Sequence, residues 1–374
     1  MSDITSGYNI AEDISLEPAF YDLCGFWESE IEEILVQLVE SCSWKASKVA
    51  EALEMIKLFY NGYCFKIART KSDLLYNPTL SLYFLKHYQR HCRPPRKMLD
   101  GNFAMDRAKM AYVASLREGE QLVTAALAEK EPVAIYELED RFGVADLLST
   151  DQDRQFFASL LYYLGVLTLG QIDEKGKLIL KIPNLVVRKL YVEHLQKKLL
   201  PNSERTEAKR VAETLCSTGD IEPLCDFIEQ RYYPIFDNRD YKSANELTLK
   251  TIFLTLLFND TVYIMDSEMA LERTYSDLTM IVRPEMRQYQ QLDLLLEFKF
   301  VKLNKVELSG QEVKQKSREE LLAIEKVKDK LKEASTQVKG YRKRLLDKYG
   351  STLNLRTFAV IGLGFEKVVW EEVP

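Results

Sequence analysis

Residues 272–299 read ERTYSDLTMIVRPEMRQYQQLDLLLEFK and contain two apolar runs, each of which carries an acidic residue. Asp277 lies in the first run, and Glu297 lies in the second run, two positions before Lys299. Successive side chains of a strand point to opposite faces, so Glu297 and Lys299 share one face while the neighbouring leucines and phenylalanines take the other. The pattern therefore predicts two strands that bring two carboxylates and an ammonium together.

Asp277, Glu297 and Lys299 are the residue types that a metal-dependent phosphodiesterase needs. Mg²⁺ takes oxygen ligands, commonly one or two carboxylates, and water and substrate phosphate complete its coordination shell. The bound cation lowers the pKa of a coordinated water, and an ammonium beside it orients that water and offsets charge on the phosphoryl group. The alternative interpretation is an antiparallel hairpin with a cross-strand salt bridge, which contributes little to stability if it is exposed.

The flanking sequence predicts further elements of such a domain. Residues 241–259 have the 3.6-residue periodicity of a helix, with Glu246 in its first turn. Beyond residue 301, a lysine-rich segment leads into a helix that ends near Leu346, and a β-type run follows at residues 355–363. The predicted order is therefore helix, strands, helix, strand.

This order and four short motifs resemble the PD-(D/E)XK nuclease family whose members follow AAA-ATPase-like domains. The motifs are Asn245-Glu246, Ser267-Glu268 with Asp277, Glu297-Phe298-Lys299, and Gln337 with Tyr341. The family often has Gly-Arg before its aspartate, whereas this chain has Tyr275-Ser276.

The resemblance implies four catalytic residues and two residues at the border of the site. These are Asp277, Glu297, Lys299 and Glu246, with Gln337 and Tyr341 at the border. By this resemblance the three carboxylates bind Mg²⁺ or Mn²⁺, and the lysine positions the attacking water.

Aromatic residues accompany turn sequences in the first part of the chain. The motifs are Gly7-Tyr8-Asn9, residues 25–30, Asn61-Gly62-Tyr63 and Tyr76-Asn77-Pro78. On the residues alone these are turns between helices, which we expect at residues 28–40 and 80–87. Together they resemble the C-terminal part of the AAA-ATPase-like domain of the same protein group. The sequence contains no GxxxxGK[ST] loop for nucleotide phosphates, so we expect no ATPase activity.

Residues 116–200 are predicted to form a module that is similar to a winged helix. Two helices precede a hairpin with strands at residues 162–169 and 178–182, and a further helix begins near Leu185. The stretch at the position of a recognition helix, residues 143–153, contains three aspartates. Their charge opposes contact with phosphate, which favours a packing or interaction role over DNA reading.

The predicted fold class is α+β, with several domains in 374 residues. The three predicted domains are a helical AAA-ATPase-like remnant (residues 1–115), a winged-helix-like module (residues 116–200) and a restriction-endonuclease-like αβ core (residues 201–374). The polar residues 200–207 are the best candidate for a linker.

Composition bears on where the protein works. The sequence is 46% hydrophobic, which is ample for a packed core, and no apolar run approaches the roughly 18 residues needed to span a bilayer. Since a signal peptide is not recognisable either, we expect a cytoplasmic protein without a membrane partner. The six cysteines include no CxxC pair, so we expect neither a zinc ribbon nor a disulfide framework, and most cysteines reduced and buried.

The charge distribution is uneven. The net charge of −6 argues mildly against a general affinity for nucleic acid. Residues 301–349, however, contain 14 Lys and Arg against 8 Asp and Glu. A basic helix beside a metal site suits a phosphate backbone, although a solvated helix with i,i+4 ion pairs accounts for the same residues.

The sequence leaves three functions open. The leading interpretation is a metal-dependent nucleic-acid phosphodiesterase, with a DNA endonuclease favoured although the residues do not separate DNA from RNA. The second is a catalytically inactive nuclease fold that binds or regulates, which the acidic total and the missing Gly-Arg favour. The third is an ATPase-derived scaffold that acts in complex with a partner carrying the nucleotide-binding loop. A homo-oligomer or another protein partner is compatible with each.

Overall fold

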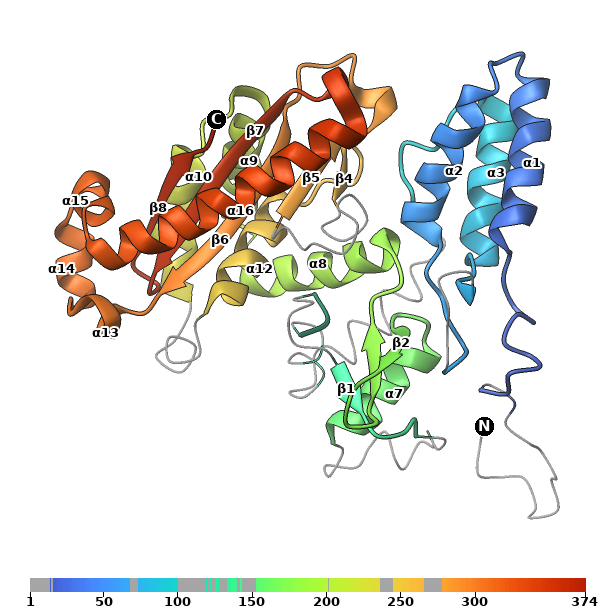
Figure 1. Ribbon diagram of the computed structural model, residues 1–374, viewed down its shortest axis with the longest axis horizontal. Helices are drawn as coiled ribbons and strands as arrows, with labels where there is room; N and C mark the ends of the chain where they lie inside the picture. The colour runs from blue at the N-terminus through green and yellow to red at the C-terminus, as the bar shows by residue number, and fades with distance from the viewer. Residues whose placement is uncertain are drawn as a thin grey trace. The chain divides into compact units, whose positions relative to one another are not determined.

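The computed structural model describes most of the chain (Figure 1). The described residues are 14, 16–67, 73–99, 119, 122, 125–127, 133–139, 142, 153–200, 202–235, 245–265 and 278–374, without the side chains of residues 198, 199 and 235. The chain divides into two compact units, Met1–Tyr191 and Val192–Pro374, called unit 1 and unit 2 below, and each mixes helices with strands. The mixed α and β class is as predicted, whereas the assignment of three domains stays a prediction.

Unit 1 begins with three helices, α1 (Glu28–Ser41), α2 (Ser47–Tyr60) and α3 (Pro78–His91). The Asn77 side chain accepts a hydrogen bond from the Leu80 amide at 3.1 Å and so caps α3, with Pro78 at the first helical position. Helices α1 and α3 confirm the two predicted helices and extend both. Helix α2 was not predicted.

A three-stranded antiparallel sheet, in the order β1-β3-β2, forms the later part of unit 1. The strands of this sheet are β1 (Val133–Ile135), β2 (Thr168–Ile172) and β3 (Leu178–Lys181). Helix α7 (Arg154–Tyr163) precedes β2, and α8 (Leu185–Leu199) follows β3 and continues past the end of unit 1 at Tyr191. The predicted hairpin and the helix at Leu185 are confirmed, but the first strand begins at Thr168 and not at Tyr162. Asp153 caps α7 by accepting from the Phe156 amide at 2.9 Å, and the helical period of buried residues then continues through Tyr162. The rest of the predicted recognition stretch, residues 143–152, lies outside the described residues.

The predicted turn at Asn61-Gly62 is present and requires glycine. Gly62 has φ +110°, and a Cβ atom there would lie 2.0 Å from the Pro183 carbonyl oxygen. Only a residue without a Cβ tolerates both the backbone conformation and that approach.

Unit 2 is built on a five-stranded sheet in the order β4-β5-β6-β7-β8. The strands are β4 (Tyr263–Met265), β5 (Leu278–Val282), β6 (Asp293–Val301), β7 (Leu355–Leu363) and β8 (Lys367–Glu372). The β6–β7 ladder is parallel, and the other three described ladders are antiparallel. Strand β6 is the middle strand and reads DLLLEFKFV, as expected for a strand with both faces covered. Strand β7 confirms the predicted bounds.

Helices cover both faces of this sheet (Figure 1). They are α9 (Arg205–Thr218), α10 (Glu222–Phe227), α12 (Glu246–Leu257), α13 (Leu303–Val306), α14 (Gly310–Gln315), α15 (Arg318–Leu322) and α16 (Glu325–Tyr349), with the short turns η3 (Ile228–Tyr232), η4 (Tyr233–Ile235), η5 (Pro284–Met286) and η6 (Gly350–Thr352). Helix α16 lies over β6 and β7, where Ala334 packs near Leu295. On the opposite face, Phe253 of α12 contacts Phe298 with ring centroids 4.9 Å apart. Among the described residues, no helix has the length and apolar character to cross a membrane.

Asp293 anchors the first residue of β6. Its carboxylate is fully buried and accepts from the Val282 amide and the Asn354 amide, each at 2.8 Å. Arg287 binds both carboxylate oxygens, at 2.9 and 3.0 Å. This buried acid therefore joins β5, β6 and the approach to β7.

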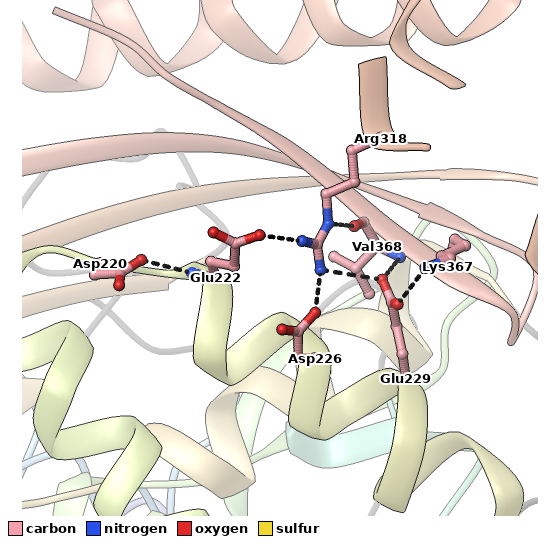
Figure 2. A network of polar contacts seen from close by, with 7 residues as sticks. All are labelled: Asp220, Glu222, Asp226, Glu229, Arg318, Lys367 and Val368. Atoms are coloured by element: carbon pink, nitrogen blue, oxygen red, sulfur yellow. Dashed lines mark hydrogen bonds and ion pairs between the residues drawn. The ribbon is translucent and has the colours of Figure 1, made fainter. Parts of the chain in front are cut away.

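Arg318, at the start of α15, joins three other elements of unit 2 (Figure 2). Its guanidinium lies 2.7 Å from Glu222 and 2.6 Å from Asp226 on α10. It also lies 3.6 Å from Glu229 on η3 and 4.1 Å from the centroid of the Trp370 ring on β8. The sequence analysis did not identify this cluster, which fastens α15 and the edge strand to the helical layer.

Cys42 and Cys92 form a disulfide. The free cysteines are Cys24, which is exposed, and Cys64, Cys216 and Cys225, which are buried. The expectation that most cysteines are reduced holds for four of the six, but only three of the six are buried, so the expected burial of most is wrong. The disulfide was not predicted because its cysteines lie 50 residues apart and belong to no spacing motif.

Candidate active site

Glu297 and Lys299 lie on the same face of β6, the face that Leu295 presents to α16. Lys299 Nζ donates to Glu297 Oε1 at 3.1 Å. The two residues are only 3% and 4% exposed. The predicted common face of Glu297 and Lys299 is therefore confirmed. The pair is buried, so it is not the exposed salt bridge of the alternative interpretation, which would contribute little to stability.

Glu246 approaches the same ammonium from α12. The Asn245 side chain accepts from the Thr248 amide at 3.1 Å and caps the helix, which places Glu246 in the first turn as predicted. Glu246 Oε1 lies 3.6 Å from Lys299 Nζ, and the Glu246 side chain is 29% exposed. An acid from a helix and an acid from a strand thus meet at one lysine.

Asp277, the remaining predicted catalytic residue, lies outside the described residues, as do Ser267 and Glu268. Its covalent neighbour Leu278 is the first residue of β5 and pairs with Leu296 of β6. Leu296 directly precedes Glu297 in the sequence. The described end of β5 is therefore next to the strand position that carries the acid–lysine pair.

Gln337 and Tyr341 lie on the side of α16 that faces the sheet. Tyr341 is 8% exposed and belongs to the apolar cluster that includes Leu295 and Ala359. Gln337 lies one turn earlier, and its Oε1 atom is buried without a hydrogen-bond partner among the described residues. Buried amide oxygens normally accept a hydrogen bond, so Gln337 offers an acceptor that the described structure does not use. The role of both residues at the border of the site stays a prediction.

The charge of Lys299 also acts on α16. The pKa of Glu333 lies below its ordinary value, first because Lys330 donates a hydrogen bond to it at 2.6 Å and also because the Lys330 and Lys299 ammonium groups lie near. Sequence reasoning missed Glu333, since one acid in a charged helix carries no motif.

The arrangement fits part of a site for a divalent cation. When all three side chains are ionised, Glu246, Glu297 and Lys299 together carry net negative charge. Mg²⁺ commonly binds one or two carboxylates and fills its remaining positions with water and phosphate oxygens. No cluster of three or more His, Cys, Asp or Glu side chains suited to a metal occurs in the part of the chain that the structure describes. The described residues therefore fit a cation held by two acids and water.

Unit 1 contains a cavity of about 500 Å³ that the sequence did not predict. Its walls are largely apolar and include the aromatic residues Phe20, Tyr21, Tyr63, Phe65, Tyr76, Tyr162 and Tyr163. None of the described residues that line it is charged. The size and lining are those of a small-molecule pocket, but none of the predicted catalytic residues is among the described residues that line it.

No protein-family model matches the chain, and no curated protein or solved structure matches it. The function of the protein is therefore inferred from the residues of this chain.

Proposed function

We propose that unit 2 is a metal-dependent nucleic-acid phosphodiesterase that cuts DNA. One observation carries the proposal: the buried Lys299 ammonium lies 3.1 Å from Glu297 and 3.6 Å from Glu246, two acids on separate elements. A cluster of two acids and a lysine beside a central strand is what cation-assisted attack on a phosphodiester requires.

The order of elements supports a PD-(D/E)XK nuclease-like core as the finer architecture. Helix α12 with Glu246 precedes the strands β4 to β6, the Glu-x-Lys pair lies on β6, and α16 leads to the parallel strand β7. Residues 1–115 as an AAA-ATPase-like remnant and residues 116–200 as a winged-helix-like module belong to the same proposal. The hairpin β2–β3 between α7 and α8, together with the pairing of β1 to β3, supports the latter.

Asp277 is the third metal ligand in this proposal. Asp277 directly precedes Leu278 in the sequence. Leu278 pairs with Leu296, which directly precedes Glu297. Asp277 itself lies outside the described residues, so its role in this proposal rests on the sequence pattern and on the pairing of its neighbour Leu278.

Each side chain has a distinct task in the proposed reaction. Glu297, Glu246 and Asp277 would hold Mg²⁺ or Mn²⁺, and the ion, when bound, would supply an acidified water and draw charge from the phosphoryl oxygens. Lys299 donates a hydrogen bond to the attacking water and then to the phosphoryl oxygens as their negative charge grows. Glu297 orients Lys299 through their 3.1 Å contact.

Burial argues against a purely structural ion pair. Taking Glu297 and Lys299 out of water costs several kcal/mol per charge, and apolar residues of similar volume commonly stabilise a fold as well or better. Both residues are almost completely buried in a strand whose other residues, apart from Asp293 at its start, are apolar. A chemical role accounts for their presence in the core of the sheet.

The rival function is a nuclease fold that binds nucleic acid or a protein without cutting. Two observations favour this function. The net charge is −6, and Glu297 Oε1 already accepts a hydrogen bond from Lys299 and is therefore less available to a metal ion. Calorimetric titration with Mn²⁺ separates the two functions. A working site binds the ion, and binding is lost in Glu297→Gln, whereas a degenerate site gives no heat with the parent protein.

Cleavage is tested by incubating the protein with plasmid, linear and single-stranded DNA in Mn²⁺. We expect Glu297→Gln, Lys299→Met and Asp277→Asn to abolish cutting. Glu307→Gln is the matched control, because Glu307 is an exposed acid shortly after β6 in the same unit. Cutting by Glu297→Gln at the parental rate would show that the activity lies elsewhere.

Cytoplasmic location stays part of the proposal, and the redox state of Cys42 and Cys92 tests it. Disulfides seldom persist in a reducing compartment. Mass spectrometry after rapid alkylation of cells should find the pair reduced if the protein resides there.

A further inference from the structure

A second pocket of unit 2, which we call the lysine pocket, lies between α16 and the end of β8. Its volume is about 250 Å³. It is lined by Lys328, Leu331, Lys332, Ser335 and Lys339 from α16 and by Glu371, Val373 and Pro374. None of these residues belongs to the candidate active site.

The lysine pocket and the candidate active site lie on opposite flanks of α16. A helix turns by about 100° per residue, so Lys328, Lys332, Ser335 and Lys339 share one flank. Glu333, on which the charge of Lys299 acts, projects from the other flank. The pocket is therefore a separate feature of the same helix.

The lysine pocket has an excess of positive charge. Its three lysines are exposed, and none forms an ion pair with a described residue. Lys330 on the same helix, by contrast, is paired with Glu333 at 2.6 Å. Glu371 is the one acidic side chain among the described residues of the lining. Three lysine side chains against one acidic side chain favour an anionic ligand.

Ser335 supplies a second, independent observation. Its hydroxyl oxygen is buried and has no hydrogen-bond partner among the described residues. A helical hydroxyl usually donates to a carbonyl one turn earlier, as Thr336 does to the Lys332 carbonyl at 2.8 Å. Ser335 leaves a buried polar atom unused in the wall of a cationic pocket, and buried polar atoms without partners are rare.

We propose that the lysine pocket binds a phosphate group, with Lys332 and Lys339 as counter-charges and Ser335 as a hydrogen-bond donor. Lysines bind phosphate as point charges, and a hydroxyl adds a directed hydrogen bond. The source of the phosphate is the backbone of the nucleic acid that the candidate active site cuts, and this choice rests on the proposed function. A free phosphorylated small molecule offers the same chemistry.

The sheet register makes one nucleic-acid segment sufficient to reach both places. Ala359 of β7 pairs with Glu297 on one side and with Glu371 on the other, so these three residues share one row and one face. Neighbouring strands lie about 4.8 Å apart, which separates the two glutamate Cα atoms by about 10 Å. A nucleic-acid strand that reaches both places passes over α16, which with its side chains is about 10–12 Å across, so its path is longer than the separation within the sheet.

The test measures binding without metal, so that no cutting occurs. Fluorescence anisotropy in EDTA compares short labelled single-stranded and duplex DNA on the parent, Lys332→Gln/Lys339→Gln and Ser335→Ala. The matched control is Lys197→Gln/Lys209→Gln, which removes the same charge from exposed lysines on α8 and α9 outside the pocket.

We expect Lys332→Gln/Lys339→Gln to weaken binding about tenfold and to lower the salt dependence by about two phosphate contacts, with less than about a twofold effect in the control. Ser335→Ala, which changes no charge, should weaken binding about threefold. Equal losses in both lysine pairs together with no effect of Ser335→Ala would overturn the proposal.

Titration with inorganic pyrophosphate separates the two sources of phosphate. Pyrophosphate binding to the parent but not to Lys332→Gln/Lys339→Gln, with no DNA binding by either, supports the pocket with a free phosphate ligand and refutes the nucleic-acid function. If the parent binds neither DNA nor pyrophosphate, the pocket is not a phosphate site.

Discussion

Replacing Lys299 with methionine isolates the electrostatic role of the lysine, because methionine keeps a long unbranched side chain and removes the charge. Glu297 is 3% exposed and would lose a cation 3.1 Å away. Removing one partner of a buried ion pair costs about 3–5 kcal/mol. Glu246 is 29% exposed, so solvent screens its share of the interaction and we assign the loss to Glu297.

Urea unfolding measures this cost if the signal comes from unit 2. The chain has three tryptophans, and a Trp27→Phe/Trp44→Phe background leaves Trp370 of β8 as the reporter. The free energy of unfolding falls by about 2 kcal/mol per molar urea, so a loss of about 4 kcal/mol in that free energy lowers the urea midpoint by about 2 M. The double variant Glu297→Gln/Lys299→Met should recover most of the loss, because it removes both charges.

Metal adds a second readout to the Lys299→Met variant. The two acids remain, so Mn²⁺ at about 100 times its dissociation constant should restore about 2.7 kcal/mol. The reasoning fails if Lys299→Met unfolds at the parental midpoint, since Glu297 would then not depend on the ammonium. A Glu297→Gln/Lys299→Met variant no more stable than Lys299→Met would also refute the electrostatic role, because the lost stability would then come from packing.

Three further predictions concern features outside the site. Asp293→Asn removes the ionic contacts with Arg287 and should destabilise unit 2 by about 3 kcal/mol in urea; an unchanged midpoint would contradict the anchoring role of Asp293. Reduction of the Cys42–Cys92 disulfide, which joins residues 50 positions apart, should destabilise unit 1 by up to about 4 kcal/mol, whereas a Cys42→Ser variant should not respond to the reductant. Burial raises the pKa of the Cys216 thiol to about 11, so its contribution to stability is complete below pH about 9 and is lost as the pH rises toward 11. Urea midpoints at pH 8 and 10.5 should therefore fall more for the parent than for Cys216→Ala, and equal falls would refute this account.

The sequence predicted the parts of unit 2 that depend on local pattern. The two-residue period of a strand is enough to place Glu297 and Lys299 on one face, and the helical period together with the Asn245 cap is enough to place Glu246 in a first turn. The approach of Glu246 to Lys299 was expected from the family resemblance and not from the period.

Features that depend on distant partners were missed. Asp293 accepts a hydrogen bond from the Asn354 amide, 61 residues away in the sequence, and Arg318 donates one to Asp226, 92 residues away. No local pattern of residues signals such contacts, because they arise only when separate elements pack. The predicted first strand of the hairpin begins at Tyr162, but the Asp153 cap and the buried apolar stripe of α7 place Tyr162 in that helix.

The parallel pairing of β6 and β7 has a consequence for the newly made protein. Each residue of β6 pairs with one that follows it by about sixty positions. Parallel strands need a crossover, here α13 to α16, so the ladder forms only after that whole connection has left the ribosome. The acids of α12 and β6 are therefore synthesised well before β7, the strand that pairs with β6. Until β7 has been made, the edge of β6 that binds it has no partner strand in the nascent chain.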